Sequence, residues 1–186
     1  TEMKNIVEDK INKKREEQKK LEDERKAKEE KERRNFIDIE LTGVDDLRRP
    51  SGLTSSQLEK GLKSGLSGLG PYFIEAEQTY GVNAVFLASV AALESAWGTS
   101  NYAVKRNNLF GYGAYTSNPD HAYYFSSKRV AILYVAQKLK TNYLTEGGSF
   151  FNGYTLEAVN KRYCTNPQWA NLVGNIMKEI NKKIQN

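Results

Sequence analysis

One run of the sequence constrains the fold more than any other. Residues 83–98 read NAVFLASVAALESAWG, in which Glu94 is the single charged residue. Asn83 is a favourable N-cap residue and Gly98 a favourable terminator, so the run predicts a helix over 84–97. A helix that is apolar nearly all round has to be buried. The chain must therefore fold around this helix, with one ionisable side chain near its end.

Residues 8–34 have the opposite character, because 22 of these 27 residues are charged. Acidic residues precede basic ones at i,i+4, as in Glu22–Lys26, and such pairs stabilise a single helix. The few apolar residues do not form the a/d seam of a coiled coil, since they fall at Ile6, Ile11 and Leu21. We predict a long charged N-terminal helix over 1–35, an arm or stalk. Self-association or assembly through it is the alternative.

The rest of the chain divides into a linker and one domain. Residues 36–53 contain turn formers without a helical period, which indicates a linker. TSSQ at 54–57 matches a capping box and begins a mainly helical domain over 54–186. Its other helices are predicted at about 71–80, 127–144, 155–162 and 167–184. Residues 101–124 are rich in Asn, Gly, Ser, Pro and Tyr, so we expect loops and a small hairpin there.

The positive charge belongs to the domain. Residues 60–186 hold 13 Lys and Arg against 7 Asp and Glu, a net charge of +6, whereas residues 1–59 come to −1. An excess of positive charge favours nucleic acid, acidic lipid or the anionic polymers of a bacterial wall. The basic residues are scattered and match no nucleic-acid motif, so we expect no nucleic acid partner. No apolar run of membrane-spanning length and no signal-peptide pattern is present, so we expect no membrane contact.

Several catalytic and metal sites are excluded by composition. Cys164 is the only cysteine, which rules out an intramolecular disulfide and a CxxC metal site. His121 is the only histidine, so a His-rich zinc site is not available, and no GxSxG elbow accompanies it. We therefore expect neither a metal nor a cofactor.

Glu94 is the leading candidate for chemistry. In a helix its neighbours are Val90, Ala91, Trp97 and Gly98, and apolar surroundings penalise the charged form, so the pKa of Glu94 should rise. A carboxylic acid that keeps its proton near neutral pH can act as a general acid toward a glycosidic oxygen. The alternative is that Glu94 points outward as the one polar position of its helix.

The other carboxylates of residues 60–186 fit other roles. Four fall on amphipathic helices, where we expect them to face solvent: Glu75, Glu77, Glu157 and Glu179. Glu146 precedes Gly147-Gly148 in a turn. Asp120, in the loop SNPDHAYYF, is the reserve catalytic carboxylate for a two-carboxylate enzyme. The alternative for Asp120 is a turn-forming role after Pro119.

Aromatic residues gather in the same part of the chain. Nine of the eleven tyrosines lie between 102 and 163, and tyrosine suits sugar rings because it offers a flat apolar face and a hydroxyl. Those of the loop insert are candidate groove residues, with packing as the alternative: Tyr112, Tyr115, Tyr123 and Tyr124. Tyr134 and Tyr143 are expected in the core. The amides of NNLFG at 107–111 could bind an N-acetyl group, or could simply shape a loop.

Four segments taken together resemble one family. ALESAWGTS (92–100), NNLFGYGAY (107–115), AYYFSS (122–127) and RYCTNPQWA (162–170) look, in this order, like the glucosaminidase domains of glycoside hydrolase family 73. The lead-in at 57–88 is similar to that of Gram-positive phage and autolysin members. The resemblance covers 54–186 and none of the arm. It implies a lysozyme-like α+β fold with a small β-hairpin insert.

The resemblance also implies a function and a site. The enzyme would be an endo-β-N-acetylglucosaminidase that cuts peptidoglycan strands between N-acetylglucosamine and the next N-acetylmuramic acid. Glu94 would be the general acid, and Tyr163 would reach into the site and support the reacting sugar. The walls of the glycan groove would come from six residues: Asn107, Asn108, Phe110, Tyr124, Phe125 and Ser126. As a wall-active protein it would act outside the cell, in the wall, at the surface, or on a phage or conjugation particle.

Two departures from the family pattern bear on activity. Thr116 stands where relatives often have Asp after GAY, which would weaken catalysis if that Asp assists. Cys164, Thr165 and Asn166 replace Ala-Thr-Asp, although Asn166 can still cap the last helix. The second catalytic group is open between the acetamido oxygen of the substrate and an activated water. A lytic transglycosylase, a muramidase, or a wall-binding module with weakened catalysis are the alternative functions.

Overall fold

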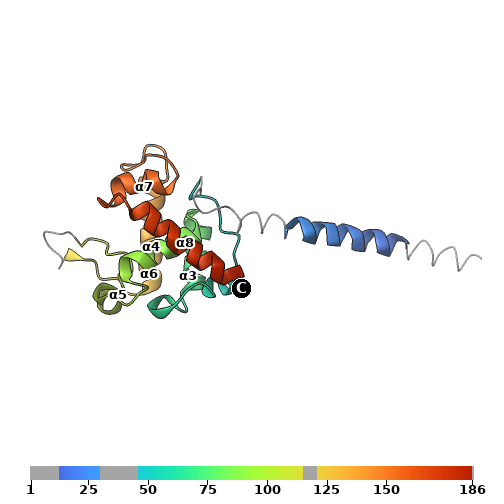
Figure 1. The fold of residues 1–186 in the computed structure, drawn as a ribbon, viewed down its shortest axis with the longest axis horizontal. Helices are drawn as coiled ribbons and strands as arrows, with labels where there is room; N and C mark the ends of the chain where they lie inside the picture. Colours follow the sequence, from blue (N-terminus) through green and yellow to red (C-terminus); the bar gives the residue numbers. More distant parts are fainter. Residues whose placement is uncertain (1–12, 30–45, 115–120, 186) are drawn as a thin grey trace, which may run out of the picture. The chain divides into compact units, whose positions relative to one another are not determined.

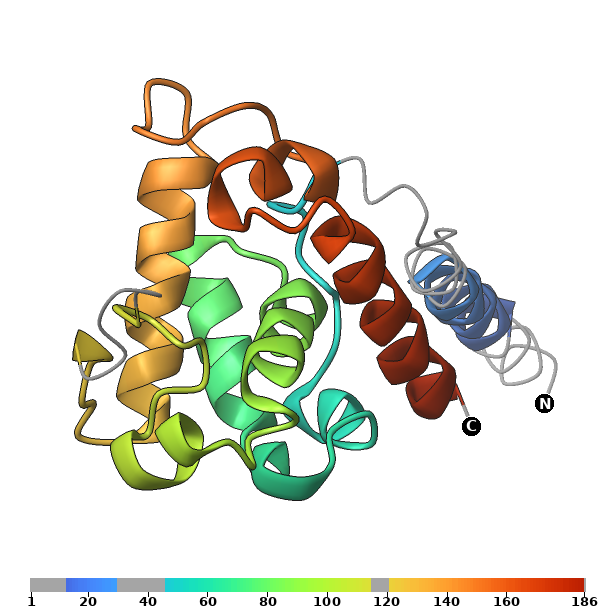
Figure 2. The same ribbon diagram turned by 60° about the vertical axis from the view of Figure 1, so that its left-hand side comes forward.

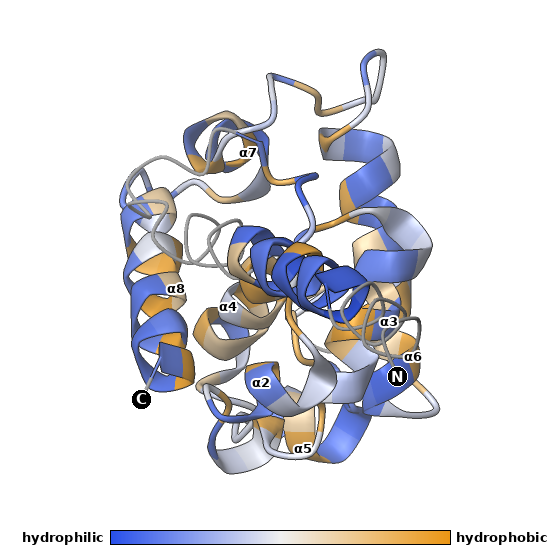
Figure 3. Cartoon of the chain, turned by 90° about the vertical axis from the view of Figure 1, so that its right-hand side faces the viewer, coloured by the Kyte–Doolittle hydropathy of each residue, from blue (hydrophilic) through white to orange (hydrophobic). Residues whose placement is uncertain are grey.

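The computed structural model describes residues 13–29, 46–114 and 121–185. The chain divides into two compact units, Thr1–Asp38 and Ile39–Asn186. In the first unit, residues 13–29 form a helix whose side chains are all exposed, as predicted for the arm. Its surface is hydrophilic (Figure 3) and carries the i,i+4 ion pairs Glu22–Lys26 at 2.8 Å and Arg25–Glu29 at 3.0 Å. The remainder of the predicted arm lies outside the described residues.

The second unit is a helical domain (Figure 1). Its elements, in chain order, are α2 (Ser55–Glu59), η1 (Ser64–Leu66), α3 (Gly70–Tyr80), α4 (Ala84–Ser95), α5 (Asn101–Arg106), α6 (Lys128–Lys138), the π-helix η3 (Leu139–Tyr143), α7 (Leu156–Tyr163) and α8 (Trp169–Gln185). No strand occurs in the described residues. Two backbone bonds cross the insert, from Tyr123 N to Tyr112 O at 3.0 Å and from Phe125 N to Arg106 O at 2.9 Å. Residues 115–120 of the predicted hairpin lie outside the described residues. No helix in the described ranges is both long and apolar enough to cross a membrane.

Helix α4 forms the centre of the domain, as its sequence predicts. Ten of its twelve residues are buried, and it packs against α3 and α8, which lie on either side of it in Figure 2. The predicted apolar stripe of α8 faces this core through Trp169, Val173, Met177 and Ile180, while its outer face is hydrophilic (Figure 3). This arrangement brings the first turn of α8 to the last turn of α4.

The helix ends follow local capping chemistry. At the start of α4, Asn83 Oδ1 accepts from Phe86 N at 3.0 Å, and Thr54 and Gln57 form the predicted capping box of α2. The short helix α5 was not predicted, because the region reads as loop. Its N-cap is Ser100, whose Oγ accepts from Ala103 N at 3.2 Å. A hydroxyl before a six-residue segment is too weak a signal to separate a short helix from a turn.

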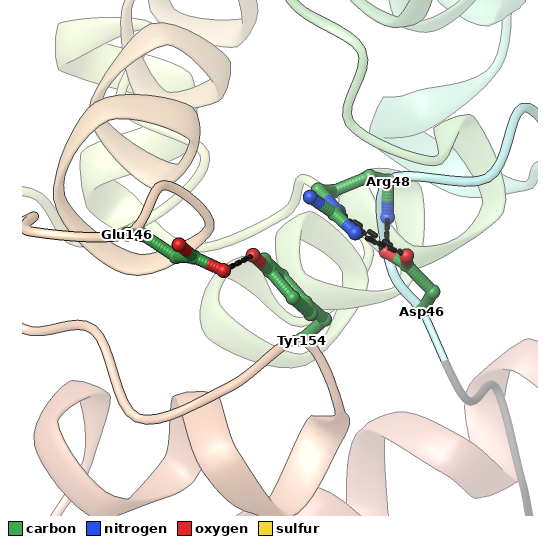
Figure 4. Close-up of polar contacts among 4 residues, drawn as sticks. All are labelled: Asp46, Arg48, Glu146 and Tyr154. Atoms are coloured by element: carbon green, nitrogen blue, oxygen red, sulfur yellow. Dashed lines mark hydrogen bonds and ion pairs between the residues drawn. The ribbon is translucent and has the colours of Figure 1, made fainter.

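The segment 46–53, assigned to a linker from its composition, is part of the domain. Leu47 is fully buried, and its amide donates to Tyr154 O at 2.9 Å. Arg48 pairs with Asp46 at 2.7 Å and stacks over the Tyr154 ring, whose hydroxyl donates to Glu146 at 3.0 Å (Figure 4). These contacts fasten the start of the domain to the loop before α7. Residues 36–45 lie outside the described residues.

The position of Glu77 also differs from the prediction. It was assigned to a solvent face, but it is 7% exposed. Its carboxylate accepts from the backbone N and hydroxyl of Ser51 at 2.6 and 3.0 Å, and from Ala84 N at 2.7 Å. Ala84 begins α4, where unpaired N–H groups and the helix dipole favour a negative charge. Glu77 therefore anchors the beginning of the helix that carries Glu94 at its other end.

Candidate active site

Glu94 lies in the last turn of α4, where the helix leaves the core. Leu93 and Glu94 are the two residues of α4 that are only half-buried. Directly after them the chain turns sharply, with Ala96 and Trp97 at left-handed φ angles of 49° and 57°. Such angles cost a non-glycine residue about 1–2 kcal/mol each. The strained turn ends the helix one residue after Glu94 and keeps its carboxyl at the rim of the core.

The Glu94 carboxyl has one hydrogen-bond donor from another helix. Trp169 Nε1, from the first residue of α8, donates to Glu94 Oε1 at 2.9 Å. Burial raises the pKa of Glu94, and the hydrogen bond from Trp169 offsets part of that rise. A carboxyl in this environment holds its proton at a higher pH than an exposed glutamate does. The bond to α8 and the partial burial do not fit the alternative in which Glu94 simply points into solvent.

Tyr163 joins the same group of side chains from the end of α7. Its ring centroid lies 4.8 Å from that of Trp169 and 5.7 Å from that of Tyr143. Burial raises the pKa of Tyr163 well above its usual range, and the negative charge of Glu94 raises it further. The hydroxyl of Tyr163 therefore stays protonated and can donate a hydrogen bond. We call Glu94, Tyr163 and Trp169 together the Glu94 site.

A buried amide holds the chain between Tyr163 and Trp169. Asn160 Nδ2 donates to Cys164 O at 3.1 Å and to Asn166 O at 3.0 Å. Its Oδ1 accepts from Ala170 N at 3.2 Å. One side chain of α7 thus fixes the loop that joins α7 to α8. Because Tyr163 and Trp169 lie at the two ends of that loop, Asn160 sets the spacing of two members of the Glu94 site.

Two of the residues expected on the groove wall are structural. Asn108 is fully buried, and its amide is taken up by backbone groups. It donates to Tyr112 O at 2.9 Å and Tyr123 O at 3.1 Å, and it accepts from Tyr112 N and Phe110 N at 3.0 and 3.3 Å. Phe110 is 5% exposed and packs in the core. These two residues hold the insert in shape, so neither offers its side chain to a substrate.

The aromatic residues of the insert pack against α6. Tyr112, Tyr123 and Phe125 surround Tyr134, with centroids 5.2, 6.2 and 5.6 Å from its ring. Tyr123 nevertheless remains 47% exposed. Tyr134 and Tyr143, both expected in the core, are half-buried and belong to aromatic clusters instead. The insert is therefore fixed by ring contacts while keeping an aromatic surface.

The remaining expected groove residues are found at or near the surface. Tyr124 is 72% exposed and lies 4.6 Å from the Arg106 guanidinium. Ser126 is exposed, and Asn107 is half-buried, donating to Phe125 O at 3.0 Å. Asp120 and Thr116 lie outside the described residues. In the described ranges no three His, Cys, Asp or Glu side chains gather closely enough to hold a metal ion.

Comparison with known proteins identifies the family. The profile of the glucosaminidase family, described as mannosyl-glycoprotein endo-beta-N-acetylglucosaminidase, matches residues 70–182. The chain belongs to this family. The prediction of a glycoside hydrolase family from the four sequence segments is thereby confirmed, and the matched residues run from α3 to α8, which together carry the Glu94 site.

The relatives that this glucosaminidase chain matches are much longer than the chain itself. A putative endo-beta-N-acetylglucosaminidase of Streptococcus pneumoniae serotype 4 is 33% identical over 150 residues, which cover 75% of this chain and 22% of the relative. A bifunctional autolysin of Staphylococcus epidermidis is 28% identical over 165 residues, covering 74% and 12%. The chain thus spans about a fifth of the length of the pneumococcal relative and a smaller share of the length of the autolysin.

A solved structure has the same fold. A catalytic mutant of Staphylococcus aureus autolysin E, in complex with the disaccharide NAG-NAM, superposes with a TM-score of 0.60. The likeness covers 75% of this chain and 72% of that one, at 22% sequence identity. The lysozyme-like, mainly helical fold predicted for the domain is therefore confirmed.

The sequence analysis does not predict two residues at the Glu94 site, Trp169 and the supporting Asn160. Trp169 was assigned to the apolar stripe of α8, and Asn160 was not singled out. Trp169 does occupy a stripe position, and helical periodicity cannot show that its N–H reaches a carboxyl on α4. A sequence signal exists for both, because Trp169 lies within the segment RYCTNPQWA and Asn160 precedes that segment by two residues.

Proposed function

We propose that this glucosaminidase domain is a peptidoglycan hydrolase that cleaves the β-1,4 bond between N-acetylglucosamine and the next N-acetylmuramic acid. The observation that carries the proposal is the Glu94 carboxyl, whose pKa is raised by burial and whose Oε1 is held by Trp169. Two comparisons support it: relatives named as endo-beta-N-acetylglucosaminidases and autolysins, and a neighbour with this fold that holds NAG-NAM.

Glu94 acts as the general acid. It transfers its proton to the glycosidic oxygen as the bond to the anomeric carbon breaks, so the leaving sugar departs as a neutral alcohol. The sugar that remains carries positive charge at its anomeric carbon, and Tyr163 supports this sugar through its protonated hydroxyl. Tyr112, Tyr123, Tyr124, Phe125, Ser126 and Asn107 line the glycan groove in this proposal.

The step that follows does not require a second carboxylate. The acetamido oxygen of the substrate can attack the anomeric carbon, and water then opens the ring that forms. In the described residues several other carboxylates are occupied: Glu59 binds Gly68 and Gly70, Glu75 pairs with Arg129, and Glu179 pairs with Lys63. Asp120 would activate water in a two-carboxylate scheme. Retention of the anomeric configuration supports the acetamido route, and inversion supports Asp120.

Analysis of the products tests the bond that is cut. Purified peptidoglycan is digested with the wild-type chain, and the products are reduced with borohydride and identified by mass spectrometry. We expect reduced N-acetylglucosamine ends. Reduced muramic ends would show a muramidase, and 1,6-anhydro muramic ends a lytic transglycosylase. Binding to the wall without any products would show a module that has lost its chemistry.

The place of action follows from the substrate. Relatives of this chain are named as autolysins, and peptidoglycan lies outside the bacterial membrane, so we place the domain in the cell wall or at the cell surface. The charged helix over 13–29 has no apolar face and acts as a spacer in this proposal. Immunolabelling of intact cells with an antibody against the domain tests the location, and labelling only after lysis would contradict it.

A further inference from the structure

The hydrogen bond from Trp169 reaches only one of the two carboxyl oxygens of Glu94, Oε1. Trp169 is 2% exposed, and its Nε1 donates to Oε1 of Glu94 at 2.9 Å. An indole N–H can only donate, whereas a protonated carboxyl has one hydroxyl oxygen and one carbonyl oxygen. The carbonyl oxygen is the better acceptor. When Glu94 is in its acid form, Oε1 is therefore the carbonyl oxygen and Oε2 carries the proton.

We propose that Trp169 is a positioning residue that assigns the catalytic proton to Oε2 of Glu94 and holds that oxygen toward the glycosidic bond. The inference rests on the proposed function, because it describes how the acid of that reaction is prepared. A general acid has to present its proton within hydrogen-bond reach of the leaving oxygen. A carboxyl that was free to rotate would present its proton in the wrong direction for part of the time.

The Trp169 ring is held on several sides, which a positioning role requires. The backbone N of Trp169 donates to Asn166 O at 3.1 Å. The backbone N of the next residue, Ala170, donates to Asn160 Oδ1 at 3.2 Å. The ring packs against Tyr163 at 4.8 Å with an angle of 36° between the planes. Helices α4 and α8 pack against each other around the bond. The indole therefore cannot turn away from Glu94 without disturbing α7 and α8.

The surroundings of Glu94 leave Trp169 as the main polar influence on it. Among the described residues, the pKa of Glu94 responds to burial and to the Trp169 bond, and no charged side chain contributes. Tyr163 faces Glu94 from α7, with Tyr143, Cys164 and Tyr112 around it in turn. On α8, the carboxylate of Glu179 is paired with Lys63 at 2.6 Å. Removal of the indole N–H should therefore raise the pKa of Glu94.

Nuclear magnetic resonance of the full chain tests the contact without relying on activity. The chain has two tryptophans, so ¹⁵N labelling gives two indole signals, and Trp97→Phe assigns them. We expect the Trp169 signal to shift in one step as Glu94 ionises, and its proton to remain protected from exchange in the acid form. Glu94→Gln should abolish the step. A Trp169 signal that does not titrate, or that loses protection when Glu94 is protonated, would overturn the proposal.

Kinetics separate positioning from packing. Trp169→Phe keeps an aromatic ring against Tyr163 but removes the donor. We expect kcat on peptidoglycan to fall roughly tenfold to hundredfold, and the alkaline limb of the kcat/KM profile to move to higher pH. Trp169→Tyr, which restores a donor, should recover part of kcat. A Trp169→Phe variant with the wild-type kcat and alkaline limb would overturn the proposal.

Failure of this inference and failure of the proposed function give different results. If the chain cleaves no glycan but the Trp169 signal still titrates with Glu94, the proton is placed as proposed and the function is wrong. If the chain cleaves peptidoglycan and Trp169→Phe leaves the pH profile unchanged, the function stands and the positioning role is wrong. If Trp169→Phe does not fold, the titrations of wild type and Glu94→Gln decide the question.

Discussion

At the residue scale, the buried Glu77 and the half-buried Glu94 differ in how fully their carboxyl groups are hydrogen-bonded. Glu77 accepts three hydrogen bonds at the start of α4, whereas Glu94 at its end accepts one. Three donors and a helix N-terminus compensate the charge of Glu77 for the loss of water. A single indole N–H does not compensate Glu94 fully, and burial raises the pKa of its carboxyl. The domain thus retains a carboxyl that is unfavourable to ionise, which is what a general acid needs.

Replacement of Glu94 by Gln should stabilise the domain at neutral pH. The pKa of Glu94 is raised in the folded state, so the folded chain holds this proton more tightly than the unfolded chain, and stability is lost as pH rises from the unfolded value toward the folded one. Gln does not titrate and can still accept from Trp169. We expect the free energy of unfolding to rise by roughly 0.5–2 kcal/mol at pH 7. Below pH 4 the difference should vanish. Urea unfolding at both pH values measures it.

Glu77→Gln is the matched control, and its effect should have the opposite sign. The amide places a donor against Ser51 or Ala84, which are themselves donors. We expect a loss of about 1–3 kcal/mol in the free energy of unfolding at pH 7. If Glu94→Gln also destabilised the domain at pH 7, the Glu94 carboxylate would be a structural group and the account of its burial would be wrong.

The sequence predicts Glu94 but not its partner, for a physical reason. A lone charge in an apolar run is visible in one helix, since the run itself implies burial. Trp169 and Glu77 obtain their roles from contacts with other elements, α4 for Trp169 and the segment around Ser51 for Glu77. Helical periodicity assigns Trp169 to the core and Glu77 to solvent, and it contains no information about which group faces each of them.

At the scale of elements, the position of Glu94 depends on how closely η1 approaches the turn after α4. Gly65 in η1 and Gly98 in that turn are in backbone contact. A Cβ added at Gly65 would lie 2.1 Å from Gly98 O, which no real structure allows. Lys128, at the start of α6, adds a bond from its Nζ to Gly65 O at 2.8 Å. Three elements thus meet at the turn that follows Glu94.

Gly65→Ala should therefore disturb both stability and catalysis. The methyl group forces η1 away from the turn, so we expect a loss of about 1–3 kcal/mol or more in the free energy of unfolding and a fall in kcat. Gly68→Ala is the control, because its methyl enters open space and strains only the backbone at φ 84°. Thermal unfolding and peptidoglycan turnover are measured for both. A Gly65→Ala variant as active and as stable as Gly68→Ala would show that the contact does not matter.

Most helix positions are predictable from the sequence, while the short helix α5 and the packing of residues 46–53 are not. The predicted starts of α2 and α4 are confirmed because each begins with a side-chain cap that acts within three residues. The helix α5 and the packing of residues 46–53 were missed. Leu47 is buried because Tyr154 and Asn83, far away in sequence, bind its backbone. Such long-range pairing leaves no periodic pattern in a short segment.

At the scale of the whole molecule, the described residues form an exposed charged helix and a domain with its own core. The two form separate compact units, and the family match covers residues 70–182 and does not include the helix over 13–29. Every described residue of that helix is exposed, so its stability comes from local ion pairs and helix propensity. The helices that carry the Glu94 site, α4, α7 and α8, all belong to the second unit.

Removal of the arm should leave the domain intact. We expect a chain that begins at Ile39 to unfold within about 2 °C of the full chain, which corresponds to less than 1 kcal/mol, and to cleave soluble glycan fragments at the same rate. Thermal unfolding and turnover of both chains measure this. A large drop in the unfolding temperature, or a loss of turnover, would show that the arm is part of the catalytic unit.

The most direct test of the central claim is the turnover of purified peptidoglycan by the wild-type chain and by Glu94→Gln, with wall binding measured alongside. If Glu94 is the general acid, turnover should fall by roughly 10²–10⁴-fold while binding is unchanged, because Gln keeps the shape of the side chain and its bond from Trp169. Turnover by Glu94→Gln within tenfold of the wild type would contradict the claim, and the acid would have to be sought elsewhere.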